Sequence, residues 1–341
     1  MRSIYDISSD ELKDYFVSKG LKPYRATQLF EAVYRQRVNS FDDITTMKKE
    51  VIEELKKDFT INTYEVVVHQ KSVDGTEKFL FKLEDGNLIE TVLMTHNYGT
   101  SVCVTSEVGC NMTCAFCASG MHKKLRNLTA GEMVMQIMSV IKESGRDVSH
   151  IVVMGIGEPF DNYDNVMRFL RIVNNAHGLE IGARHISVST CGLVPKIYDY
   201  ASENLQSNLA ISLHAPNNEI RDQIMPINKA YRIEELVKAI SDYIKLTNRR
   251  VTIEYILIND LNDSVKCANE LADLLHGLNV YINLIPYNEV KEKPFKRSTK
   301  EHMTKFYDQL KKRSMNVTLR LEQGSDIDAA CGQLRSNNIK K

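Results

Sequence analysis

The amino-acid sequence predicts an α/β protein, a partial (β/α)6 barrel of the TIM type, preceded by a small helical domain and a short β linker. Three observations predict this fold. Apolar residues recur at helical spacing over residues 1–60, the period changes to two over residues 61–95, and short β-rich runs alternate with helical runs over residues 96–341. Strands that alternate with helices of about 10–15 residues indicate βαβ units and a parallel sheet. About six such units suit a barrel better than a short open sheet.

Residues 1–60 carry the signals of a compact helical unit. Ser9 or Asp10 can cap a first helix. Lys22-Pro23 separates it from the next, because proline cannot continue a helix. We interpret this unit as an accessory domain.

Residues 61–95 carry hairpin signals. Asp74-Gly75 and Asp85-Gly86 are turn dipeptides between strand-like runs. We therefore expect a small meander that joins the helical unit to the barrel. Its predicted strands are Glu65–Val68, Lys78–Leu83 and Leu88–Leu93.

The barrel part begins at about residue 96. In such barrels the chemistry lies where strands end and loops begin, so the residues after each strand are candidates for a site. The predicted strands are Ser101–Thr105, Ile151–Met154, His185–Ser189, Leu209–Leu213, Val251–Ile256, Val280–Leu284 and Val317–Leu321, and the predicted helices are Ala130–Glu143, Asn165–Asn174, Ile233–Leu246 and Val265–Leu275.

The composition excludes several classes of protein. Lysine plus arginine equal aspartate plus glutamate at 44 each, so net charge does not indicate a nucleic-acid partner and any such surface must be a local patch. Met1–Asp10 lacks the apolar core of a signal peptide, and no run approaches the roughly 18 apolar residues of a spanning helix. Seven cysteines, an odd number, do not form a disulfide framework in a chain of 341 residues. We expect a cytoplasmic monomer with no membrane contact.

Three cysteines, Cys110, Cys114 and Cys117, lie within eight residues. Iron–sulfur clusters are usually held by four thiolates, so three leave one iron open to another ligand. Zinc is the alternative, but it requires a fourth ligand, usually from a second pair, and the nearest histidine, His122, is isolated. The run therefore predicts an iron–sulfur cluster with a vacant coordination site, on a loop that follows a barrel strand.

This spacing, with Phe116 before the last cysteine, resembles the signature of the radical S-adenosylmethionine (SAM) superfamily. The resemblance implies that Cys110, Cys114 and Cys117 bind a 4Fe–4S cluster and that Phe116 packs beside the nucleoside of SAM. It also implies that an electron from the cluster, supplied by a donor such as flavodoxin or ferredoxin, splits SAM to a 5′-deoxyadenosyl radical.

A glycine-rich turn follows the predicted strand Ile151–Met154. Glycines there let backbone amides approach a ligand closely, and Pro159 fixes the turn. Such a turn by itself is weak evidence of a site. About 40 residues after the cysteines, it is similar to the superfamily's GGEP-like motif, which implies that Gly157 and Glu158 bind the amino group of SAM.

Two further cysteines narrow the family. Cys103 lies on the strand before the cysteine loop, and Cys331 stands in the run DIDAACGQL near the C-terminus. Its chemistry alone would make Cys331 a buried structural thiol. With NLTAGE at Asn127–Glu132 and MPIN at Met225–Asn228, these segments resemble the adenine-C2 methyltransferases of bacterial 23S rRNA and tRNA, over about residues 22–334.

The resemblance implies a reaction that uses two SAM per turnover. Carbon 2 of adenine is electron-poor, so it accepts a carbon radical rather than undergoing a polar methyl transfer. Cys331, as a thiolate, accepts a methyl group from one SAM, and the 5′-deoxyadenosyl radical from a second SAM activates that methyl group, which adds to C2. Glu90 accepts the C2 proton, and Cys103 resolves the adduct through a disulfide with Cys331.

Polar residues at further strand ends match positions where that family contacts SAM. Each by itself is more often a satisfied core group, and Glu90 by itself would count as an outward-facing strand residue. The implied SAM contacts are Phe116, Gly157, Glu158, Ser189, Ser212, Leu213, His214 and Asn288.

The RNA-binding surface is harder to predict from the sequence than the SAM site. Basic residues of the helical unit, with tyrosines between them, are either solvated helix faces or an RNA-binding patch, and both interpretations stay open. An extruded target base would have to enter the barrel. The candidates are Lys22, Arg25, Arg35, Arg37, Lys48 and Lys49 of the helical unit, Lys123, Lys124 and Arg126 after the cysteines, and Arg249-Arg250.

Two alternatives remain. Methylation at C8, as in the related enzymes that confer antibiotic resistance, uses the same five cysteines. A non-enzymatic iron–sulfur or zinc module that binds RNA would need neither Cys331, Cys103 nor the glycine-rich turn.

Overall fold

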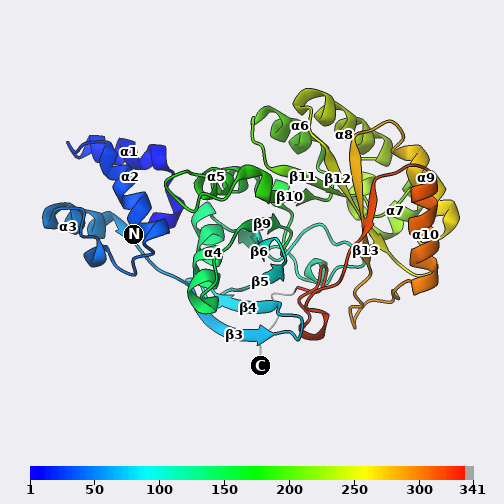
Figure 1. Ribbon diagram of the computed structural model, residues 1–341, viewed down its shortest axis with the longest axis horizontal. Helices are drawn as coiled ribbons and strands as arrows, with labels where there is room; N and C mark the ends of the chain where they lie inside the picture. The colour runs from blue at the N-terminus through cyan, green and yellow to red at the C-terminus, as the bar shows by residue number, and fades with distance from the viewer. Residues whose placement is uncertain (335–341) are drawn as a thin grey trace.

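The computed structural model describes residues 1–334, which form an α/β protein around one ten-stranded sheet (Figure 1). The strand order is β14-β13-β12-β11-β10-β9-β6-β5-β4-β3. Neighbours from β6 to β14 pair in parallel, and β3 to β6 pair antiparallel. The strands are β3 (Glu65–Lys71), β4 (Glu77–Lys82), β5 (Leu88–His96), β6 (Gly99–Cys103), β9 (His150–Val153), β10 (Ile186–Thr190), β11 (Asn208–Ser212), β12 (Val251–Leu257), β13 (Val280–Pro286) and β14 (Val317–Leu319).

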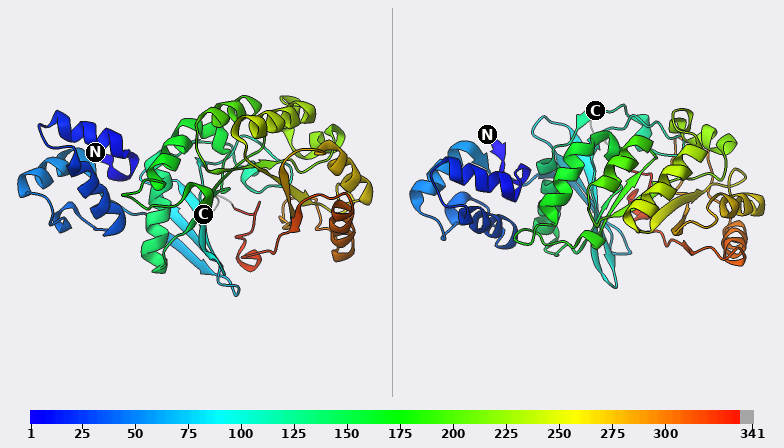
Figure 2. Two further views of the ribbon diagram at one scale, coloured as in Figure 1. Left: turned by 45° about the horizontal axis from the view of Figure 1, so that its top comes forward. Right: turned by 90° about the horizontal axis from the view of Figure 1, so that it is seen from above.

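Helices cover the outer face of the curved parallel part, as βαβ crossovers require (Figures 1 and 2). The predicted α/β class and partial barrel are confirmed. None of the described helices is both long and apolar enough to cross a bilayer. The barrel helices are α4 (Ala130–Ser144), α5 (Tyr163–Val173), α6 (Val194–Ser202), α7 (Asn218–Ile224), α8 (Ile233–Thr247), α9 (Val265–Leu274) and α10 (Lys300–Lys312).

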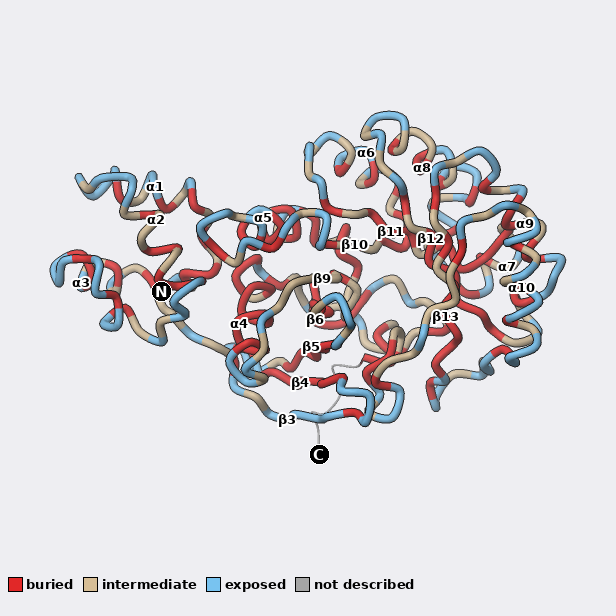
Figure 3. Tube along the Cα trace, viewed as in Figure 1, coloured by how far each residue is buried: buried red, intermediate tan, exposed pale blue. Residues whose placement is uncertain are grey.

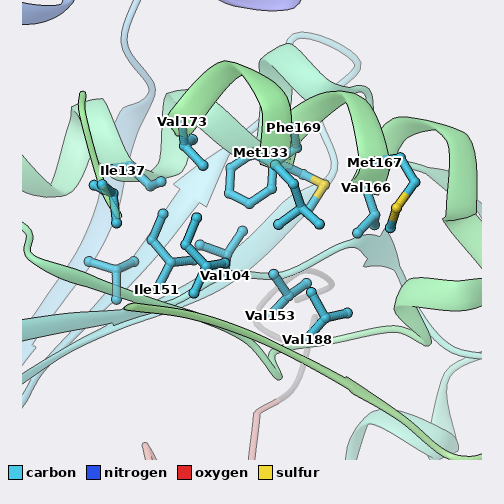
Figure 4. Close-up of a cluster of buried hydrophobic side chains, with 14 of the residues drawn as sticks. Val104, Met133, Ile137, Ile151, Val153, Val166, Met167, Phe169, Val173 and Val188 are labelled. Carbon is cyan, nitrogen blue, oxygen red and sulfur yellow. The ribbon is translucent and has the colours of Figure 1, made fainter. Parts of the chain in front are cut away.

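The core lies between the sheet and its helices. Figure 4 shows Met133 and Ile137 of α4 and Phe169 of α5 against Ile151 and Val153 of β9. All five side chains are fully buried. Burying a side chain of this size stabilises the fold by about 1.5–3 kcal/mol. The apolar strands therefore give firm support to the polar residues that follow their carboxyl ends.

The motif at residues 127–132 begins α4. Thr129 and Glu132 form a capping box, in which each side chain accepts a hydrogen bond from the other residue's backbone N–H. Gly131 is required because a Cβ there would lie 2.6 Å from the Cβ of Asp6, whose carboxylate accepts from the Gly131 N–H at 2.9 Å. The motif therefore joins the helical unit to the barrel.

The helical unit lies at one end of the molecule (Figure 2). Ser8 is the N-cap of its first helix, so the expected cap at Ser9 or Asp10 was wrong by a residue. Arg35 pairs with Glu180 at 2.7 Å and Arg37 pairs with Asp147, so these two cations hold the unit against the barrel. The helices of the unit are α1 (Ser9–Ser18), α2 (Tyr24–Phe30) and α3 (Lys49–Asp58), with a short parallel pair of β1 (Arg2–Ser3) and β2 (Phe59–Thr60).

The strands of residues 61–95 extend the barrel's own sheet. β5 pairs antiparallel with β6, and Val92 lies opposite Cys103. β3, the outer edge, is mostly exposed, whereas β4 and β5 are mostly buried (Figure 3). The inner face of β5 is thereby directed at the same space as the barrel strands.

Candidate active site

Two adjoining cavities mark the site. The first, the cluster cavity, lies at the carboxyl ends of β9 to β12. The second, the thiol cavity, lies beside it, between β5, β6 and the C-terminal segment. Cys117, Arg320 and Cys331 line both. Of the predicted site residues, Cys110, Cys114, Cys117, Phe116, Gly157, Glu158, Ser189, Ser212, His214 and Cys331 line the cluster cavity, and Cys103, Cys117, Asn288 and Cys331 line the thiol cavity.

The cysteine loop is held by backbone hydrogen bonds. The Cys110 N–H donates to the His122 carbonyl, and the Ala115 N–H donates to the Ile224 carbonyl, both at 2.9 Å. Gly109 has φ +80°, and a Cβ there would lie 2.4 Å from the Lys123 carbonyl oxygen. Only glycine permits this close approach, which sets the direction of the loop.

The thiols of this loop suit a cluster. Cys110, Cys114 and Cys117 are free and line one cavity. Burial raises the pKa of Cys110 to about 12, and burial and the two neighbouring thiols raise the pKa of Cys114. Thiolates in such a place need cationic iron beside them. Within residues 1–334, no three His, Cys, Asp or Glu side chains are arranged to hold a single metal ion.

The turn after β9 brings a carboxylate into the cluster cavity. Gly157 has φ +106°, and a Cβ there would lie 2.6 Å from the side chain of Glu107. The Glu158 carboxylate accepts from the Phe160 N–H at 3.0 Å and the Cys191 N–H at 2.8 Å. It therefore joins the ends of β9 and β10, and burial raises its pKa. An ammonium group in this cavity would find an acceptor here.

Glu107 supports this turn through a hydrogen bond, and sequence reasoning did not identify it as a residue of the site. It is fully buried, and its carboxylate lies 2.7 Å from the Lys124 Nζ and accepts from the Glu158 N–H at 3.0 Å. Lys124 also pairs with Asp161 at 2.8 Å. Burial raises the pKa of Glu107 to about 7, although the hydrogen bond and the positive charge of Lys124 lower it.

We expect a Glu107→Gln variant to change how stability depends on pH. The folded pKa of about 7 exceeds the ordinary 4.5, so the stability that this group contributes is present below about pH 4.5 and is lost as pH rises through about 7. Between about pH 5 and pH 8 the wild type should lose on the order of 1–3 kcal/mol relative to the variant. Unfolding followed by circular dichroism at both pH values measures this, with exposed Glu143→Gln as the control. A pH-independent difference between wild type and Glu107→Gln would contradict the expectation.

The ends of β10 and β11 carry the next polar side chains. The Ser189 and Ser212 hydroxyls lie 3.3 Å apart and line the cluster cavity. His214 accepts from the Ile256 N–H at 3.1 Å, and burial lowers its pKa to about 3, so it is neutral. The ring of Phe116 meets the His214 ring edge to face at 5.0 Å. Leu213 does not line either cavity and is buried in the main core.

A buried arginine explains the motif at residues 225–228. Arg221 donates to the Cys191 carbonyl at 2.7 Å and to the Leu213 carbonyl at 3.2 Å. Asn228 accepts from Arg221 at 3.0 Å. The guanidinium therefore ties together the two strand ends that carry the serines, which sequence reasoning did not foresee.

Glu90 lies on the inner face of β5. It is buried, and its carboxylate lies 3.5 Å from the Lys78 Nζ. Strand alternation places it on one face with Val92 and Met94, which pack in a cluster with Cys103. The interpretation of Glu90 as an outward-facing strand residue is therefore wrong. Its role as the acceptor of the C2 proton stays a prediction.

The meander anchors the C-terminal segment, which returns across the open side of the barrel (Figure 1). Asp326 accepts from the Ser72 hydroxyl at 2.5 Å, and the Gly324 N–H donates to the Asp74 carboxylate at 2.8 Å. Further along, Asn288 donates to the Cys331 carbonyl at 3.1 Å. The hairpin turn that the sequence marked as a linker therefore positions Cys331.

Cys103 and Cys331 share the thiol cavity, and neither forms a disulfide. Burial, and then the charge of Cys331, raise the pKa of Cys103 to about 12, and Arg320 opposes this rise. Two thiols far apart in the sequence therefore line one cavity, where the charge of Cys331 helps to raise the pKa of Cys103.

The candidate basic residues are dispersed. Lys124 and Arg126 are in ion pairs, with Glu107 and Glu132 respectively. Arg249 and Arg250 precede β12 and so lie at the opposite edge of the sheet from the cluster cavity. Arg35 and Arg37 are in the ion pairs described above, and half-buried Arg25 donates to the Gln28 side chain and the Thr46 carbonyl. The remaining exposed candidates, for which no pairing is described above, are Lys22, Lys48, Lys49 and Lys123.

Comparison with known proteins gives three findings. Residues 105–275 match the model of the radical SAM superfamily, and residues 3–61 match the ribosomal RNA large subunit methyltransferase N-terminal domain. Relatives described as "Probable dual-specificity RNA methyltransferase RlmN" include one from Acholeplasma laidlawii, 56% identical over 98% of this chain and 99% of its own, and one from Listeria welshimeri, 57% identical over 99% and 95%. The crystal structure of a radical SAM methyltransferase from Sphaerobacter thermophilus is 44% identical with a TM-score of 0.94, over 99% of this chain and 100% of that chain.

Proposed function

The chain belongs to the RlmN family of radical SAM RNA methyltransferases, and from that premise we propose that it methylates carbon 2 of an adenine in 23S rRNA, in the peptidyl-transferase region, and of adenine 37 in tRNA. The family also implies a 4Fe–4S cluster and SAM as cofactors. The observation that carries the proposal is the thiol cavity, in which Cys331 and Cys103 lie together and next to Cys117. A cysteine pair beside a cluster loop supports a reaction in which the protein itself carries the methyl group.

The three loop cysteines hold the cluster, and with SAM bound it supplies a carbon radical. Glu158, whose carboxylate lies in the cluster cavity, binds the amino group of SAM. Phe116 and His214 present ring surfaces for the adenine, and Ser189 and Ser212 present hydroxyls. Asn288 has a buried side-chain oxygen that lacks a protein partner, which suits a ligand hydroxyl.

The remaining residues act on the methyl group and the base. Cys331, as a thiolate, accepts a methyl group from one SAM, because the thiolate is the nucleophilic form of cysteine. The methyl carbon would lose a hydrogen atom to the 5′-deoxyadenosyl radical from a second SAM and then add to C2, and the adduct would give up one electron to the oxidised cluster. Glu90, on the inner face of β5, removes the C2 proton. Cys103 then attacks the Cys331 sulfur, and the bond from that sulfur to the methylene carbon breaks. The carbon takes up a proton and becomes the methyl group, which frees the methylated RNA and leaves a Cys103–Cys331 disulfide.

The proposal extends to the partners. An electron donor such as flavodoxin or ferredoxin reduces the cluster, and the protein acts as a monomer in the cytoplasm. The exposed basic residues of the helical unit contact the RNA backbone. The base enters the cavities after leaving its stack.

The test is the position of the methyl group. The gene is expressed in a strain that lacks its own enzyme, and nucleosides from purified 23S rRNA and tRNA are resolved by mass spectrometry against 2-methyladenosine and 8-methyladenosine standards. We expect 2-methyladenosine in both RNAs. A methyl group on C8 would replace this proposal with the C8 alternative, and unmodified adenine with an intact cluster would favour a non-enzymatic RNA-binding module.

A further inference from the structure

Lys78 is a buried lysine of β4 to which the proposed reaction gives no role. Its side chain is 10% exposed, and its Nζ lies 3.5 Å from the Glu90 carboxylate. The same Nζ donates to the Asp328 carbonyl at 3.2 Å. An ammonium group is rarely buried unless it is paired, and these two contacts supply its partners. Lys78 therefore connects β5 with the C-terminal segment, three residues before Cys331.

The register of the sheet places Lys78 beside the proposed reacting groups. Lys78 lies opposite Val92 in the antiparallel pair of β4 and β5. Glu90 lies opposite Leu80 in the same pair, so it is a diagonal neighbour of Lys78 on one face of the sheet. Val92 lies in turn opposite Cys103 of β6, lines the thiol cavity and packs in one cluster with Cys103. The ion pair of Lys78 and Glu90 is therefore on the face that borders the thiol cavity.

Glu77, the neighbour of Lys78 on β4, has other partners. Its carboxylate pairs with Arg146 and lies 2.5 Å from the His69 Nε2. Successive side chains of a strand point to opposite faces, so Glu77 is directed away from Lys78. Within residues 1–334, the carboxylate with which Lys78 forms an ion pair is that of Glu90.

We propose that Lys78 is a positioning residue that orients the Glu90 carboxylate for removal of the C2 proton. The inference rests on the proposed function, in which Glu90 takes that proton. A carboxylate acts as a base only when it is held within hydrogen-bond reach of the proton. The Lys78 ammonium holds the carboxylate from one side, and the Asp328 carbonyl holds the ammonium. Lys78 thereby links the base to the segment that carries Cys331.

The proton transfer balances in atoms and charge. The adduct that has given up one electron is a cation. Its C2–H bond breaks, the electron pair of that bond returns to the ring, and the proton passes to a Glu90 oxygen. The cationic adduct and the carboxylate become a neutral adduct and a neutral carboxyl group. The Lys78 ammonium keeps its charge and its protons throughout.

The test is the decay of the covalent protein–RNA adduct in a single turnover of the cluster-containing protein, followed by rapid quench. It is measured with unlabelled RNA and with RNA deuterated at C2 of the target adenine. In Lys78→Met the decay should slow by about 10- to 100-fold, because the base is no longer held in place. The slow decay should show a deuterium isotope effect at least as large as that of the wild type, because removal of the C2 proton then limits it.

Further variants separate the orientation of Glu90 from the anchoring of the C-terminal segment. Lys78→Arg keeps a cation and should recover most of the decay rate. Lys78→Gln can still donate to a carbonyl but carries no charge, so its adduct should decay as slowly as that of Lys78→Met. In a Glu90→Gln protein, adding Lys78→Met should have little further effect, because Lys78 acts through Glu90. Lys82→Met, on the same strand beside exposed Glu65, should follow the wild type.

Three outcomes would overturn the inference. They are an adduct of Lys78→Met that decays at the wild-type rate, a slow decay without a deuterium isotope effect, and a Lys78→Gln adduct that decays like the wild type, which would make Lys78 an anchor only. If Lys78→Met does not retain the cluster, Lys78→Gln must show the slow, isotope-sensitive decay. The proposed function fails separately, if the methylated product of the wild type keeps deuterium on C2, because the methyl group then lies elsewhere.

Discussion

A Cys331→Ala variant is expected to keep its cluster and fold but to leave RNA adenine unmethylated. The side chain faces both cavities and is the proposed acceptor of the methyl group, so its loss removes the carbon that reaches the base. Product should fall by a factor of at least about 10³, as when a covalent catalyst is removed. The measurement is 2-methyladenosine in reconstituted protein supplied with SAM, reductant and RNA, alongside the visible absorption of the cluster.

Cys267→Ala is the matched control. Cys267, like Cys331, is a free thiol, but it is buried on α9 beside Ser264 and lines neither cavity. It should retain near wild-type product and cluster content. Product from Cys331→Ala at the level of this control would mean that the methyl group reaches the base without passing through Cys331.

The alternation of strands and helices could be predicted because buried parallel strands are apolar along their whole length. The seven parallel strands were predicted to within about two residues at nearly every end. α10 was not predicted, because only Met303, Phe306 and Leu310 are buried among its thirteen mostly charged and polar residues. The pairing of β5 with β6 was not predicted either, since a turn dipeptide fixes a hairpin but not the sheet that the hairpin joins.

The cysteine loop and the turn at Gly157 and Glu158 could be found because each is a local pattern. The charged side chains that surround them could not be found from the sequence. Glu107 lies outside the predicted strand Ser101–Thr105 and was not singled out, and Lys124 was one residue of a basic run. The two become a buried pair only when the loop folds back. Arg320 lines one cavity with Cys103 and Cys331 because the C-terminal segment covers the open side of the barrel. Long-range electrostatics of this kind follow from the fold.

A Cys103→Ala variant is expected to trap the RNA. Cys331 can still be methylated and its methyl carbon can still add to C2, but the thiol that resolves the adduct from within the thiol cavity is absent. A covalent protein–RNA species should therefore accumulate, and free methylated RNA should fall by about 10²-fold or more. A denaturing gel shows the adduct, and nuclease digestion followed by mass spectrometry locates it on Cys331.

The double variant Cys103→Ala with Cys331→Ala is the control, and it should form no adduct, because the carbon that links protein and RNA is gone. The wild type offers an independent check. The Cys103 pKa of about 12 leaves it mostly a thiol near neutral pH, so its thiolate fraction grows about tenfold per pH unit and release of the adduct should quicken as pH rises. Release from Cys103→Ala at the wild-type rate would show that another group, or water, breaks the adduct.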